Sequence, residues 1–163
     1  MFINGNLETT FKHRFTNLWE IDALEVSGDL RLTDHMPYKT NMSSGLWAGK
    51  NISIQGLVNP EPYRFEINLH HKDGIAFHYN RFDENTVVRN NRTMNEWRLE
   101  ERSGEMPFQK GKIFQMIISC TTEQYNVFVN GNLETTYNHH FTNLWEIDVL
   151  EVSGDLSLTD LYA

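Results

Sequence analysis

The residues best suited to chemistry lie between Phe77 and Arg102, in the run FHYNRFDENTVVRNNRTMNEWRLEER. This run supplies a histidine, asparagines, arginines and glutamates around one tryptophan, Trp97. Hydroxyl groups need donors and acceptors held at fixed angles, and the C–H face of a sugar ring packs on a flat aromatic surface. The combination therefore favours a ligand covered in hydroxyls, and our hypothesis is a saccharide.

Short strands must position these side chains. Alternate residues of a strand share a face, so we expect His78 and Asn80 to project together, as Asn90 does with Val88. Their polar side chains would then form one surface across neighbouring strands.

The same alternation places Arg98, Glu100 and Arg102 on one side of the strand that follows the tryptophan. Arginine presents a rigid fork of donors that suits a carboxylate and a neighbouring hydroxyl oxygen. Glu100 would therefore orient both guanidinium groups and also accept hydrogen bonds from sugar hydroxyls.

The dominant period of the chain is two, which is the period of a β-strand. Apolar residues alternate with polar ones over 51–57 and 64–69, and residues 113–120 form a nearly continuous apolar run, typical of a strand buried on both faces. Asn130-Gly131 is a type I′ hairpin signal because both residues tolerate positive φ. One short turn is expected over residues 143–147. These patterns predict an all-β fold, an antiparallel sandwich or barrel.

Two segments of the chain are near duplicates. Residues 2–34 and 128–160 differ only at positions 3, 11, 12, 14, 23 and 31. We interpret residues 1–34 as the last strands of an upstream domain in a tandem array, and residues 35–163 as a complete domain. Residues 2–34 cannot bury both faces of a sheet alone, so a homodimer formed by strand exchange of residues 1–34 is a further hypothesis.

The composition indicates an acidic globular chain. Its 163 residues carry 14 Lys+Arg against 22 Asp+Glu, a net charge of −8, which argues against nucleic acid as a partner. No apolar run reaches the ~18 residues of a membrane helix, so membrane insertion is not expected. Cys120 is the only cysteine, and the first residues do not resemble a secretory signal. A reducing, cytoplasmic location is therefore expected.

Metal binding and glycan cleavage are the alternative chemistries. The histidines at 70–71 and 139–140 are adjacent pairs, whose members point to opposite faces of a strand, so neither a zinc site nor a cofactor is expected. Glu100 and Glu101 diverge in the same way and do not flank a glycosidic bond at the ~5–10 Å that hydrolysis requires. The chain is therefore not expected to be an enzyme.

Three motifs, in this order, resemble the carbohydrate-recognition domain of the galectin family, which reads H-x-N-P-R, then V-x-N, then W-x-x-E-x-R. The matching residues are His78, Asn80, Val88, Asn90, Trp97, Glu100 and Arg102. The flanking segments RFDEN, FVNG and LEVSGDLSLTDLY are also similar to the family, and the resemblance covers about residues 37–163. It implies a two-sheet, jelly-roll-like sandwich without a metal in the site.

The chain departs from the family inside the first motif. H-x-N-P-R has become His78-Tyr79-Asn80-Arg81, without the proline. On a regular strand Arg81 faces away from His78 and Asn80. A one-residue bulge would restore Arg81 to the ligand side, or Arg98 would take over part of its role; otherwise binding is weakened or redirected.

The resemblance implies a non-enzymatic lectin for β-galactoside-containing glycans, such as lactose or N-acetyllactosamine, on glycoproteins or glycolipids. The implied carbohydrate-binding residues are His78, Asn80, Arg81, Asn90, Trp97, Glu100 and Arg102. The alternative is a galectin-fold protein with weakened or lost sugar binding that acts as a protein-interaction or structural module. Members of the family commonly lack signal peptides, so non-classical secretion from the cytoplasm stays open.

Overall fold

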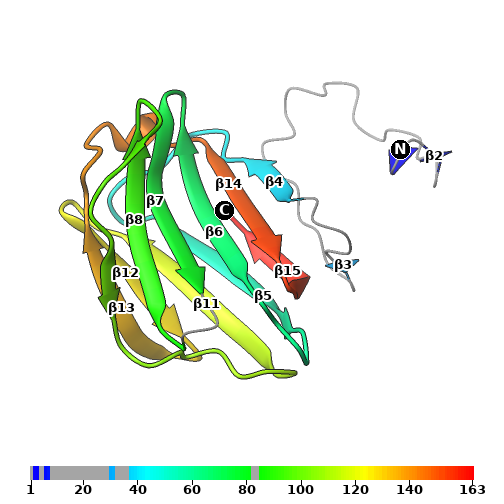
Figure 1. The fold of residues 1–163 in the computed structure, drawn as a ribbon. Coiled ribbons are helices and arrows are strands. Elements are labelled where there is room, and N and C mark those ends of the chain that lie inside the picture. The colour runs from blue at the N-terminus through cyan, green and yellow to red at the C-terminus, as the bar shows by residue number, and fades with distance from the viewer. Residues whose placement is uncertain (1, 4–5, 8–29, 32–36, 82–84) are drawn as a thin grey trace.

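Two antiparallel sheets packed face to face make up the fold (Figure 1). The computed structural model describes residues 2–3, 6–7, 30–31, 37–81 and 85–163. Over these residues the regular structure is β-strand apart from a single 3-10 turn at Leu144–Glu146, inside the segment expected to turn. The all-β prediction is confirmed.

Sheet I carries the motif residues. Its strands follow the order β10-β8-β7-β6-β14-β4, and β9 pairs with the last two residues of β8, Arg92 and Thr93. Their bounds are Tyr38–Asn41 (β4), Phe65–His71 (β6), Gly74–Arg81 (β7), Val87–Thr93 (β8), Glu96–Trp97 (β9), Glu101–Ser103 (β10) and Val149–Gly154 (β14). In Figure 1 β8, β7, β6 and β14 lie side by side, so residues far apart in the sequence share one surface.

Sheet II covers the other side of the core, in the order β13-β12-β11-β5-β15-β3. Its strands run over Leu30–Arg31 (β3), Asn51–Val58 (β5), Ile113–Cys120 (β11), Gln124–Val129 (β12), Asn132–Asn138 (β13) and Leu156–Tyr162 (β15). The remaining strands, Phe2–Ile3 (β1) and Asn6–Leu7 (β2), pair only with each other.

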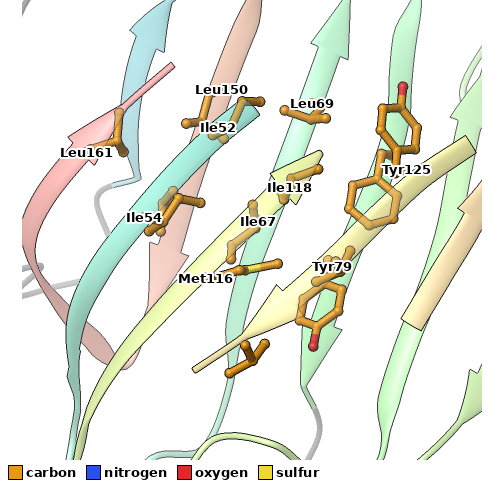
Figure 2. Packing of buried hydrophobic residues seen from close by; sticks show 14 of the residues in the cluster. Ile52, Ile54, Ile67, Leu69, Tyr79, Met116, Ile118, Tyr125, Leu150 and Leu161 are labelled. Atoms are coloured by element: carbon orange, nitrogen blue, oxygen red, sulfur yellow. The ribbon is translucent and has the colours of Figure 1, made fainter. Parts of the chain in front are cut away.

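The core lies between the sheets (Figure 2). Ile67 and Leu69 of β6 belong to the same buried cluster as Ile54 of β5 and Met116 of β11, and each of the four is fully buried. Burial of one such side chain stabilises the fold by about 1.5–3 kcal/mol. The interdigitated side chains thus fix which face of sheet I points outward.

One detail of the strand prediction was wrong. The apolar run at 113–120 was expected to be buried on both faces, but burial alternates along β11. Ile113 is 79% exposed, whereas Phe114 and Met116 lie in the core. The reason is that an antiparallel sandwich covers only one face of each sheet, so apolar residues at outward positions stay in contact with solvent.

The predicted type I′ hairpin is present between β12 and β13. Asn130 and Gly131 have φ of 51° and 82°, as this turn requires. The hairpin pairs Phe128 with Leu133, and the duplicated segment pairs Phe2 with Leu7 in the same register. The two copies therefore form matching hairpins where the structure describes both.

A bulge in β7 sets the orientation of the first motif. The register of β7 against β6 shifts next to Leu69, and against β8 it shifts between Ile75 and His78. Both shifts add one residue to β7 before His78. From Asn80 to Arg81 the register continues without a shift. The bulge in β7 therefore does not lie at the position that would turn Arg81 to the ligand side.

Candidate functional site

An open groove crosses the outer face of sheet I. It has a volume of about 540 Å³. The lining residues are Arg64, His78, Asn80, Asn90, Trp97, Arg98, Leu99 and Glu100. Strands β7, β8 and β9 and the segment after Trp97 thus bring together residues from all three motifs, as their spacing predicted.

His78 and Asn80 form the floor of the groove. They are only 7% and 0% exposed. The Nδ1 atom of His78 lies 2.5 Å from Oδ1 of Asn68, and Nδ2 of Asn80 lies 3.1 Å from His78 Nε2. Burial, with the charges of Arg64 and Arg92, lowers the pKa of His78 to about 4. The imidazole is therefore neutral near pH 7 and retains one unprotonated ring nitrogen.

Trp97 stands beside this floor with 48% of its surface exposed. Its ring centroid lies 4.8 Å from that of His78, with 59° between the planes. The guanidinium carbon of Arg92 lies 5.4 Å from the same indole. Cation–π attraction and the His78 contact hold the ring in place. The exposed part of the indole offers the flat surface that a sugar C–H face requires.

Asn90 organises the segment that follows Trp97. Its Nδ2 donates to the carbonyl of Arg98 at 3.0 Å, and its Oδ1 accepts from the backbone N–H of Asn91 at 2.8 Å. The Arg98 carbonyl thus bonds to a side chain, and the regular strand is interrupted over residues 98–100. The strand is therefore not continuous as expected, but Arg98 and Glu100 still line the same groove, and Arg102 bonds to Glu100.

Glu100 and Arg102 form the rim. The Nε and Nη2 atoms of Arg102 donate to the same Glu100 oxygen, Oε2, at 3.0 Å and 2.8 Å. Their side chains are 42% and 45% exposed, so the pair contributes little to stability. Glu100 lines the groove, and Arg102 acts on it through this contact. Of the two arginine pairings expected for Glu100, the structure shows the one with Arg102.

The groove differs from the family pattern in which arginines line it. The side chain of Arg81 lies outside the described residues. Arg64, directly before β6, lines the groove and pairs with Glu66. Sequence reasoning missed Arg64 as a site residue. The signal was present, because alternation over 64–69 puts Arg64, Glu66 and Asn68 on one polar face of the strand next to the H-x-N strand.

Two structural observations concern other classes of function. Within residues 37–81 and 85–163 and the short N-terminal strands, no group of histidine, cysteine, aspartate and glutamate side chains is arranged to hold a metal ion. Among the same residues none belongs to a helix long and apolar enough to cross a membrane.

Comparisons with known proteins agree with the fold and the motifs. The family model "Galactoside-binding lectin" matches residues 37–163. The 32 kDa beta-galactoside-binding lectin of Caenorhabditis elegans is 37% identical over 161 residues, covering 93% of this chain and 57% of that protein. Its namesake from Haemonchus contortus is also 37% identical, covering 93% of this chain and 56% of the relative. The chain therefore spans somewhat more than half the length of these relatives.

A solved structure has a similar fold. The crystal structure of the galectin LEC-6 of Caenorhabditis elegans superposes with a TM-score of 0.72 at 25% sequence identity, covering 85% of this chain and 94% of the other. Its likeness extends to the two-sheet sandwich described above. With the family model matched over residues 37–163 and the three motifs gathered in one groove, this chain belongs to the galactoside-binding lectin family, the galectins.

Proposed function

We propose that this chain binds β-galactoside-containing glycans, such as lactose or N-acetyllactosamine, in the groove on the outer face of sheet I. The observation that carries the proposal is the convergence of buried polar atoms and a half-exposed indole in one groove of a chain from this family. Membership of a galactoside-binding lectin family supports this proposal and the expectation that the domain is not an enzyme.

Each part of the groove has a role in this binding. The indole of Trp97 packs against the C–H face of the galactose ring. The Oδ1 atom of Asn80 is buried without a hydrogen-bond partner among the described residues, so it is an acceptor for a ligand hydroxyl. At the rim, Glu100 accepts from further hydroxyls while Arg102 fixes its orientation. The ligand's hydroxyls are neutral and water competes for the same groups, so we expect a Kd in the micromolar to millimolar range.

We further propose that Arg64 and Arg98 supply the guanidinium that the family motif places after the proline. Both line the groove, and the charge of Arg64 acts on His78. The absence of a register shift between Asn80 and Arg81 supports this assignment, because the backbone does not turn Arg81 to the side of Asn80. Arg64→Ala is then expected to weaken lactose binding more than Lys110→Ala, an exposed cation outside the groove.

The test is a lactose titration by calorimetry, supported by tryptophan fluorescence, on the full chain. Trp97→Ala is the informative variant. Trp145→Ala is its matched control, because Trp145 is also exposed, at 69%, but does not line the groove. Saturable binding that is lost in Trp97→Ala and kept in Trp145→Ala supports the proposal. A folded wild-type chain that does not bind at tens of millimolar lactose would contradict it and favour the interaction-module alternative.

A homodimer formed through residues 1–34 remains our proposal for assembly. It is supported by the hairpin β1–β2, which repeats the register of the corresponding pairs in β12–β13 and so matches a segment that another copy of the chain also contains. Light scattering coupled to size exclusion should give a dimer mass for residues 1–163 and a monomer mass for residues 35–163. A concentration-independent monomer mass for the full chain would contradict strand exchange.

A further inference from the structure

A line of polar side chains crosses sheet I and ends in the groove. Lys39 Nζ on β4 lies 2.7 Å from Glu151 Oε2 on β14. The other Glu151 oxygen, Oε1, accepts from Asn68 Nδ2 on β6 at 3.2 Å. Asn68 Oδ1 meets His78 Nδ1 on β7, and His78 Nε2 meets Asn80 Nδ2. The line connects a half-exposed lysine to two residues at the floor of the groove.

Glu151 determines the direction of every hydrogen bond in this line. An ionised carboxylate can only accept, so the Asn68 atom that faces it must be the amide nitrogen. The Asn68 oxygen then faces His78 and also can only accept. The proton of the His78 ring must therefore be on Nδ1, which is the donor in the 2.5 Å contact.

The direction continues into the groove. With the proton on Nδ1, Nε2 of the neutral His78 is an acceptor, so Asn80 must present its amide nitrogen to it. The Asn80 oxygen is then left as the buried acceptor without a hydrogen-bond partner among the described residues. The line thus determines, through His78, which atom of Asn80 the groove offers to a ligand.

The neighbours of Glu151 keep it ionised. Burial alone would raise the pKa of the Glu151 carboxyl, but hydrogen bonds from Lys39 and Asn68 and the proximity of His70 outweigh burial and hold that pKa below its usual value. Nε2 of His70 lies 3.3 Å from Oε2, on the side of the carboxylate that Lys39 occupies. The oxygen that faces Asn68 therefore keeps its role as an acceptor.

We propose that Glu151 is a positioning residue that sets the hydrogen-bond polarity of the groove from outside it, by fixing the Asn68 amide and thereby the Nδ1–H tautomer of His78. Its consequence for ligand binding rests on the proposed lectin function. Its consequence for the tautomer does not, because the tautomer can be observed without any sugar.

Glu151→Gln tests this direction with almost no change in shape. A glutamine offers one acceptor and one donor, and the Lys39 ammonium draws the amide oxygen to its own side. The amide N–H then faces Asn68, which turns its oxygen to residue 151 and its N–H to His78. The ring proton moves to Nε2, so Asn80 must turn its oxygen to the ring and its amide N–H to the side where a ligand previously met an acceptor. Lys39→Met in the same chain removes this pull, leaves the glutamine oxygen available to Asn68 and should restore the original direction.

The measurement is the tautomer of His78 by long-range ¹H–¹⁵N correlation NMR of the imidazole nitrogens, assigned with His78→Gln. We expect Nδ1–H in the wild type and in Glu123→Gln, which serves as the control because Glu123 is an exposed carboxylate in the turn between β11 and β12 of sheet II. We expect Nε2–H in Glu151→Gln and Nδ1–H again in Lys39→Met/Glu151→Gln. The lactose Kd should rise by about tenfold in Glu151→Gln and recover in the double variant.

Each other result overturns the proposal. A wild-type His78 protonated on Nε2 contradicts the assigned direction, and a Glu151→Gln chain that keeps Nδ1–H contradicts control by Glu151. A switched tautomer with an unchanged lactose Kd contradicts the positioning role. If the wild type does not bind lactose, the proposed function fails, and the tautomer of the three variants still decides whether Glu151 controls His78.

Discussion

The outward faces of the two sheets differ in the type of side chain they carry and in how far those side chains are buried. On sheet I the outward side chains Asn68, His78 and Asn80 are polar and nearly inaccessible, at 2%, 7% and 0% exposure. On sheet II the outward side chains of Ile113 and Leu57 are apolar and remain 79% and 38% exposed. A buried polar group costs free energy unless it is hydrogen-bonded, whereas an exposed aliphatic side chain is common. The face that buries polar groups, and so depends on hydrogen bonds between them, is therefore the one to which we assign the proposed function.

The largest expected effect is a pH dependence of stability that arises at His78 of sheet I. Burial, with Arg64 and Arg92, lowers the pKa of His78 from 6.5 to about 4. Between these values the unfolded chain binds a proton that the folded chain does not, so the free energy of unfolding decreases as the pH falls from 6.5 to 4. The full decrease from this residue is about 3 kcal/mol.

Urea unfolding at a series of pH values measures this effect. In His78→Gln the slope between pH 6.5 and 4 should be smaller than in the wild type, since a glutamine does not titrate. Equal slopes in both chains would show that His78 is not held neutral by its surroundings.

The next effect separates binding from stability on the floor of the groove. Asn80→Ala removes the acceptor oxygen that faces the ligand, together with the amide that donates to His78, so we expect lactose affinity to fall by about thirtyfold. The free energy of unfolding should change by less than about 1 kcal/mol, because the variant also removes a buried oxygen without a partner among the described residues. Calorimetry and urea unfolding on one preparation provide both values. A large loss of stability with unchanged affinity would assign Asn80 a structural role.

A smaller effect is expected at the rim. Glu100→Gln keeps the shape of the side chain but weakens its pairing with Arg102, so lactose affinity should fall by about tenfold, while stability changes by less than about 1 kcal/mol. Glu105→Gln, an exposed carboxylate that does not line the groove, is the matched control. Equal affinities of the two variants would exclude Glu100 from recognition.

The smallest effect is expected on the outer face of sheet II. Ile113→Thr replaces an exposed aliphatic side chain with another β-branched residue, so both lactose affinity and thermal stability should match the wild type, within about 0.5 kcal/mol of unfolding free energy. If Ile113→Thr instead changes the oligomer mass or the affinity, the outer face of sheet II has a function of its own.

The sequence was sufficient to predict the strands and most of the residues that line the groove. Period two predicted the strands, Asn130-Gly131 predicted its hairpin, and alternation placed His78, Asn80 and Asn90 on one face. These features depend on local backbone geometry, which sequence spacing reports directly.

Features that depend on side-chain partners were not predictable in this way. At the break over residues 98–100 the Arg98 carbonyl bonds to the Asn90 side chain, and the position of Arg64 depends on which strand neighbours β7. The line from Lys39 through Glu151 to His78 joins strands separated by up to 112 positions in the chain, a pairing that only the sheet order of the folded protein reveals.

The central claim is that a β-galactoside occupies the outer face of sheet I, and amide chemical-shift mapping with lactose tests it most directly. Cellobiose is the matched control, because it differs from lactose only in the configuration at C4 of the terminal sugar. We predict that lactose shifts the amides of β6, β7, β8 and residues 97–100, that sheet II is unaffected, and that cellobiose has little effect at the same concentration. Shifts confined to sheet II, or equal responses to both sugars, would contradict the claim.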